Sequence, residues 1–148
     1  MSWWPPVFVL FAASLLPIQA ACNGALNRAL GRPLLVVLIS LTGSALFITA
    51  IGLATGRLGL PGEGRAAEVP WWAWPAGVMG AIYLSSQPIV APRLGAATYM
   101  GLSVVAQIGM ALALDHFGAL HLPQHDASPL RIAGVLLMGA GVVLVARN

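Results

Sequence analysis

The chain has 148 residues, of which 59% are hydrophobic and only 7% are charged, and its mean hydropathy is +0.88. A soluble domain carries about 25% charged residues, so this composition excludes a water-soluble domain and a disordered chain. The isoelectric point of 10.0 comes from seven arginines against four acidic residues, with no lysine and no basic run, so no nucleic-acid partner is predicted. The sequence therefore predicts an all-α integral membrane protein, a single domain in contact with the lipid bilayer.

Five segments approach the length of a membrane span, which is about 20 consecutive apolar residues. A polar, glycine-rich stretch at 57–69 separates the second from the third, and a loop at 118–128 separates the last two. We expect Pro88 and Pro92 to end the third segment. The expected spans of this bundle of about five helices are residues 5–27, 33–56, 70–87, 96–117 and 129–146.

The arginines give only a weak signal for orientation in the membrane. With the N-terminus outside, Arg28, Arg32, Arg93 and Arg147 lie on the inner face, and Arg57, Arg65 and Arg131 lie on the outer face. An odd number of spans with so small a bias suits a chain that inserts both ways round, so that two copies form an antiparallel homodimer around a midplane site. A single orientation set by the four-to-three majority is the alternative, with equal weight.

Polar residues recur at every fourth position of the first span, at Gln19, Asn23 and Asn27. Residues four apart share one face of a helix, so these amides form one stripe. A polar stripe inside a bilayer must face protein or water. It is either the wall of a polar cavity, which we favour, or a set of interhelical hydrogen bonds that hold the helices together.

The fourth span carries a second row with the same spacing, Tyr99, Ser103 and Gln107. The rows on the first and fourth spans are the best candidates for facing one another across a pore or pocket. The predicted substrate path is lined by Gln19, Asn23, Tyr99, Ser103 and Gln107.

Asp115 is the only carboxylate on an expected span, and His116 follows it. An acid within the membrane is a functional candidate by default, and Asp115 with His116 is the predicted site of proton coupling. The alternative is an interfacial residue that pairs with an arginine such as Arg131, since Asp115 lies two residues from the expected end of the helix.

Catalytic and metal chemistry are not predicted. Pro123 lies between His121 and His125, so the histidines of this loop do not share a helical face that could bind a metal ion. Asp115 and His116 are adjacent and diverge on a helix, and no nucleophile lies beside them. We predict no enzyme activity and no cofactor.

Several short runs in this order resemble the YdcZ-type family of the drug/metabolite transporter superfamily. The runs are Gln19 to Asn23, Leu26-Asn27-Arg28, Pro92-Arg93-Leu94-Gly95-Ala96-Ala97, Gln107 and Asp115-His116-Phe117-Gly118. The resemblance covers almost the whole chain, although Ala106 and Ala111 depart from the family pattern. It implies a small five-helix inner-membrane exporter, equivalent to one half of the ten-helix inverted-repeat transporters of that superfamily.

These observations predict an inner-membrane exporter of a small organic molecule that is coupled to protons and works as a homodimer by rocking of one protomer against the other. The lack of a mid-membrane carboxylate favours a neutral, polar or amphipathic substrate. The alternative function is a non-transporting membrane scaffold or accessory subunit. A scaffold tolerates Gln19→Leu or Gln107→Leu, whereas a transporter loses substrate binding while it stays folded.

Overall fold

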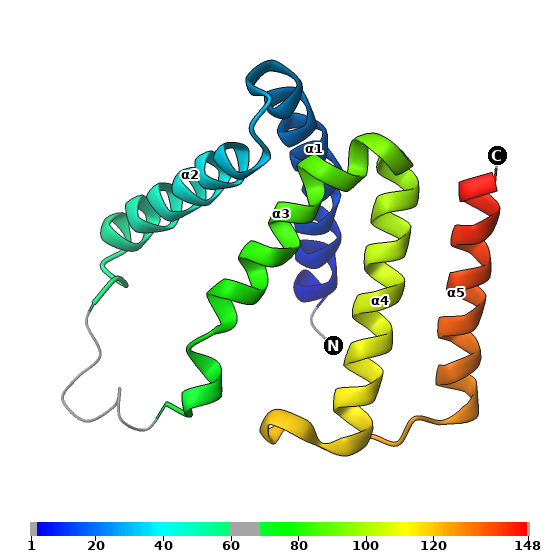
Figure 1. The fold of residues 1–148 in the computed structure, drawn as a ribbon. Helices are drawn as coiled ribbons and strands as arrows, with labels where there is room; N and C mark the ends of the chain where they lie inside the picture. Colours follow the sequence, from blue (N-terminus) through cyan, green and yellow to red (C-terminus); the bar gives the residue numbers. More distant parts are fainter. Residues whose placement is uncertain (1–2, 60–68, 148) are drawn as a thin grey trace. The chain divides into compact units, whose positions relative to one another are not determined.

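The computed structural model describes residues 3–59 and 69–147, and within these two ranges the chain forms helices and no strand (Figure 1). The α-helices confirm the predicted all-α fold class. In chain order the elements are α1 (Trp4–Leu30), α2 (Pro33–Ala54), the 3-10 turn η2 (Trp71–Ala73), α3 (Ala76–Leu94), α4 (Ala96–Phe117), the 3-10 turn η3 (Ala119–His121) and α5 (Pro129–Arg147).

Four of the five described α-helices, α1, α2, α4 and α5, are long and apolar enough to cross a membrane. The helix that falls short is α3, in which Ser85, Ser86 and Gln87 are followed by two prolines. The expected fifth crossing, by α3, therefore stays a prediction. The polar stretch expected at 57–69 lies mostly outside the described residues.

The ends of α4 coincide with those expected from the sequence, and those of α5 agree to within one residue. Glycines set both ends of α4. Gly95 precedes the helix with φ +82° and Gly118 follows it with φ +57°. Both values lie in the left-handed region that side chains disfavour, so glycine suits these two sharp turns.

The third helix was predicted wrongly at both ends. It begins at Ala76 rather than at residue 70, because the tryptophan-rich stretch before it forms only a 3-10 turn. It also runs through Pro88 and Pro92 to Leu94 instead of ending at the first proline. A proline removes one backbone N–H from a helix, but a membrane helix tolerates this loss where a neighbouring side chain serves the carbonyl that is left free.

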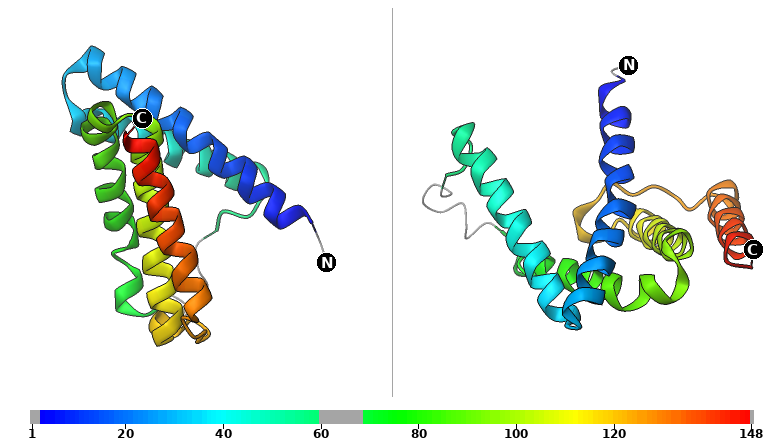
Figure 2. Two further views of the ribbon diagram at one scale, coloured as in Figure 1. Left: turned by 90° about the vertical axis from the view of Figure 1, so that its right-hand side faces the viewer. Right: turned by 90° about the horizontal axis from the view of Figure 1, so that it is seen from above.

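The described chain forms two compact units. The first comprises residues 1–17 and 93–148, and the second comprises residues 18–92. In the first unit α4 and α5 run side by side in opposite directions (Figures 1 and 2). They pack tightly at Gly101, where an added Cβ would lie 2.7 Å from Cγ2 of Val142. A glycine at this position therefore lets the two backbones approach.

In the second unit the C-terminal part of α1, the first turns of α2 and the last turns of α3 come together (Figure 2). The apolar residues buried here are small or β-branched, namely Ala20, Val36, Val37 and Ala91. Most large apolar side chains on the helices are instead exposed, for example Phe8 at 61% and Leu136 at 69%. A chain with this surface requires lipid, or further protein, around it.

Candidate functional site: a buried amide cluster

The first candidate site is a network of polar side chains centred on Asn23 of α1. The Asn23 side-chain Nδ2 donates a hydrogen bond of 2.9 Å to Oε1 of Gln87 on α3. Its Oδ1 accepts one of 2.6 Å from the hydroxyl of Ser40 on α2. Asn23 is 3% exposed and Gln87 is 0% exposed. Three helices thus contribute one polar group each to this position. We call Asn23, Asn27, Ser40 and Gln87 the amide cluster.

Asn27 lies one turn beyond Asn23 and holds the proline-containing part of α3. Its Nδ2 donates a hydrogen bond of 2.9 Å to the backbone carbonyl of Pro88. In an unbroken helix this carbonyl would accept from the N–H of residue 92, but Pro92 has none. Asn27 therefore supplies the donor that the second proline removes, which explains how α3 continues through it.

Two atoms of the amide cluster are buried without a hydrogen-bond partner, Nε2 of Gln87 and Oδ1 of Asn27. Leaving such a group unpaired costs about 1–3 kcal/mol, so buried polar groups are normally satisfied. One is a donor and the other an acceptor; Gln87 is bonded to Asn23, and Asn27 is the next residue of α1's polar stripe. Each of these two atoms therefore has an unused capacity for one hydrogen bond.

The predicted path residues are divided between the two units. Asn23 is the centre of the cluster, and Gln19 lies half-buried one turn before it on α1. Tyr99, Ser103 and Gln107 belong to the first unit. Tyr99 is buried, Gln107 is exposed, and the Ser103 hydroxyl donates to the backbone carbonyl of Tyr99 at 2.8 Å. That the two rows face one another stays a prediction.

Ser40 and Gln87 are not among the site residues predicted from the sequence. A polar residue directly before a proline marks a break in helical hydrogen bonding, and this signal could have pointed to Gln87. Ser40 gave no such signal, because serine and threonine hydroxyls recur in α2 and each can bond to the helix's own backbone.

The second candidate site lies where α4 ends and α5 begins, in the first unit. Nη2 of Arg131 is 2.9 Å from Oδ2 of Asp115, and the two side chains are 44% and 29% exposed. This is the pairing with an arginine that is the alternative prediction for Asp115. Proton coupling through Asp115 and His116 stays a prediction.

The loop after α4 folds back onto the end of that helix. The N–H of His125 donates to the carbonyl of Asp115 at 2.9 Å, and Nε2 of Gln124 donates to the carbonyl of His116 at 2.9 Å. The Nδ1 atom of His116 accepts from the N–H of Ala127 at 3.3 Å. The loop thereby serves carbonyls that the last turn of a helix leaves free, which fixes the helix end beside Asp115.

Metal-binding residues do not gather in the part of the chain that the structure describes. In residues 3–59 and 69–147, no three histidine, cysteine, aspartate or glutamate side chains are arranged to hold a metal ion.

The long apolar helices, their exposed surface and the buried amides together define a multi-pass membrane protein. The chain belongs to the family described as "Putative inner membrane exporter, YdcZ", whose sequence profile matches residues 4–144. It is 30% identical over 118 residues to the inner membrane protein YdcZ of Escherichia coli (strain K12), a match that covers 76% of this chain and 74% of the relative. No solved structure matches. The protein is therefore a multi-pass inner-membrane protein of an exporter family.

Proposed function

We propose that the chain exports a small, uncharged, polar organic molecule across the inner membrane, and that the amide cluster forms part of the substrate path. The observation that carries this proposal is the pair of unpartnered buried atoms, Nε2 of Gln87 and Oδ1 of Asn27. A group such as a carboxamide or hydroxyl both donates and accepts, so it can pair with either kind of atom. None of the four cluster side chains carries a charge, which matches a neutral substrate better than an ion.

We expect the affinity for substrate to differ between conformations of the exporter. In the described conformation Gln87 is fully buried, so a substrate reaches it only when α3 or its neighbours move. The two prolines of α3 leave fewer backbone hydrogen bonds across Pro88, and this is where a membrane helix bends most easily. We propose that the hydrogen bond from Asn27 to the carbonyl of Pro88 breaks when the path to Gln87 opens.

We infer that the working exporter is a homodimer. One chain leaves large apolar side chains exposed along α1, α2, α4 and α5, and it has the size that the family resemblance assigns to half of an inverted-repeat transporter. The weak arginine bias is compatible with insertion in both orientations, so we propose an antiparallel pair that rocks about a path shared by the two copies.

A scaffold or accessory subunit is the second candidate, and it is favoured by the hydrogen bonds that Asn23 and Asn27 already make. Interhelical hydrogen bonds of this kind hold membrane helices together, at about 0.6 kcal/mol each on average. A scaffold does not require the unpartnered Nε2 of Gln87, whereas a binding site uses it.

Export is tested by untargeted mass spectrometry of the medium around cells that produce the chain or its Gln87→Leu variant. We expect at least one small neutral compound to accumulate outside with the natural chain. Loss of one hydrogen bond to substrate lowers affinity about tenfold, so Gln87→Leu should reduce that accumulation about tenfold at subsaturating substrate.

The matched control for this experiment is Ser85→Ala, on the same helix. The Ser85 hydroxyl donates to the carbonyl of Ala81 within α3, so its loss should leave export unchanged. The amount of each variant in the membrane is measured alongside. Equal accumulation with the natural chain and with well-inserted Gln87→Leu would contradict the proposal and favour the scaffold.

A further inference from the structure

A long groove follows the pair α4 and α5 in the first unit. One part, of about 290 Å³, is lined by residues from Ile108 to Asp115 on α4 and from Arg131 to Met138 on α5. A second part, of about 440 Å³, continues from Met138 toward Val145. Met138 lines both parts, so they form one groove, which we call the α4–α5 groove.

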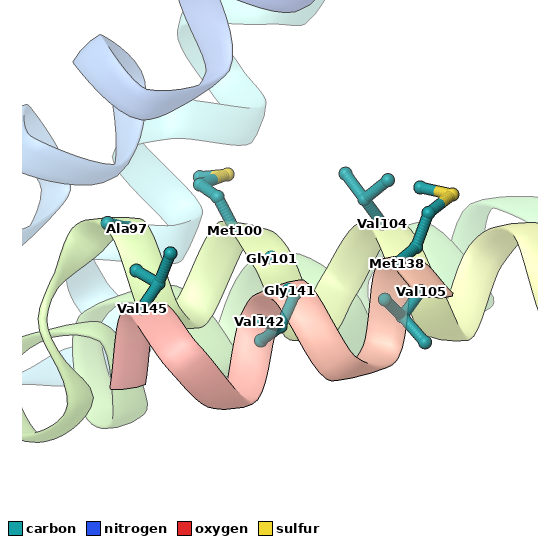
Figure 3. Close-up of a pocket in the computed structure, with 9 residues that line it drawn as sticks. All are labelled: Ala97, Met100, Gly101, Val104, Val105, Met138, Gly141, Val142 and Val145. Atoms are coloured by element: carbon teal, nitrogen blue, oxygen red, sulfur yellow. The ribbon is translucent and has the colours of Figure 1, made fainter. Parts of the chain in front are cut away.

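The walls of the α4–α5 groove are apolar and flexible. Figure 3 shows Met100, Val104 and Met138 pointing to the same side of the helix pair. Val104 is 43% exposed and Met138 is 38% exposed, so this side of the groove is open in one copy. Methionine side chains adapt their shape to an apolar ligand, and small residues such as Ala111 and Gly134 leave room for it.

One end of the groove is charged, in contrast to its walls. Asp115 and Arg131 both line it there, and they are paired at 2.9 Å. Each is partly exposed, and a guanidinium has five N–H donors, so the bond to Asp115 leaves others for a ligand. Both residues stand within the last or first turn of their helices, at the level where a spanning helix meets the headgroups.

We propose that the α4–α5 groove binds one acyl chain of a phospholipid whose headgroup carries both a phosphate and an ammonium, with the phosphate at Arg131 and the ammonium at Asp115. The charge pair of the protein is complementary to the charge pair of such a headgroup. The apolar groove below it is complementary to the acyl chain.

The groove is long enough for one acyl chain. It follows α5 from Arg131 to Val145, over which a helix rises about 21 Å, at about 1.5 Å per residue. Half of a hydrocarbon core of about 30 Å is about 15 Å, so an acyl chain of one leaflet fits within this length.

A second copy of the chain is the alternative occupant of the groove. The charged end favours the lipid, because a phospholipid carries a phosphate and an ammonium a few atoms apart and at headgroup depth.

The proposal is tested by native mass spectrometry of the full chain after extraction from vesicles of phosphatidylethanolamine and phosphatidylglycerol. Ala111 lines the groove, whereas Ala113 on the same helix does not. We expect one phosphatidylethanolamine per chain to stay bound to the natural protein and to Ala113→Leu. Ala111→Leu fills the groove, and Arg131→Gln removes a charge-assisted bond, so each should retain about tenfold less lipid.

Arg147→Gln, at the other end of α5, is the control for Arg131→Gln and should retain the lipid. Cross-linking of Val104→Cys in a Cys22→Ala background tests whether a second copy of the chain occupies the groove instead. Equal lipid retention by Ala111→Leu and Ala113→Leu would overturn the proposal, as would equal retention of phosphatidylglycerol. Cross-linking of two copies through position 104 would also overturn it, because a second copy would then cover the groove. None of these outcomes depends on whether the chain exports a substrate.

Discussion

Single cysteines at Gly59 and at Pro123, in a Cys22→Ala background, are expected to be labelled by a membrane-impermeant reagent from both faces of the membrane. The two positions lie in the loops after α2 and after α4, close to Arg57 and His125. Four arginines on one face and three on the other bias insertion only slightly, so both orientations should be populated. Only such a mixed population supplies the antiparallel homodimer proposed above.

The extent of labelling from each side is compared with full labelling after the membrane is dissolved in detergent. Partial labelling from both sides at both positions supports dual insertion. If both cysteines react from one side alone, the chain has one orientation with α3 as a span. If they react from opposite sides, the chain has one orientation and α3 does not cross. Either of these results contradicts the antiparallel dimer.

Asn27→Leu is expected to destabilise the protein by about 1 kcal/mol, because it leaves the carbonyl of Pro88 without a donor. In a Pro92→Ala background the same change should cost much less, since residue 92 then supplies the helical N–H. The two changes are thus coupled although 65 positions of sequence, from 27 to 92, separate them. The free energy of unfolding in detergent micelles, measured for both single variants and the double variant, gives the coupling.

Pro17→Ala is the matched control for Pro92→Ala in this double-variant experiment. Pro17 also lies inside a helix, α1, but ten residues from Asn27, or about 15 Å along the helix axis. Its effect should therefore add to that of Asn27→Leu. Equal effects of Asn27→Leu in the natural and Pro92→Ala backgrounds would show that Asn27 does not stabilise α3 through Pro88.

The helices that the sequence predicts well are those whose ends are set locally. Gly95 and Gly118 bound α4, and Pro129 begins α5 in the position where proline favours a helix start. The ends of α3 could not be predicted in this way. Its passage through Pro92 depends on Asn27, a residue on another helix, and a hydrogen bond between helices leaves no trace in the local pattern of either one.

The candidate site was predicted in part for the same reason. Gln19, Asn23 and Asn27 all lie in α1, so their spacing places them on one face of that helix. Helical periodicity does not say which residues face that stripe, so Ser40 and Gln87 emerge only from the packing of α1 against α2 and α3.

Thiol accessibility tests, without knowledge of the substrate, whether the amide cluster lies on a path open to water and substrate. The Ser40 hydroxyl contacts Asn23, whereas Leu38 on the same helix is 60% exposed on the apolar surface. The thiolate is the form of cysteine that attacks an impermeant thiol reagent, and it forms readily in water and poorly in apolar surroundings. In a Cys22→Ala background we predict that Ser40→Cys reacts and that Leu38→Cys does not. Failure of Ser40→Cys to react from either side of the membrane would show a sealed structural contact and contradict the account.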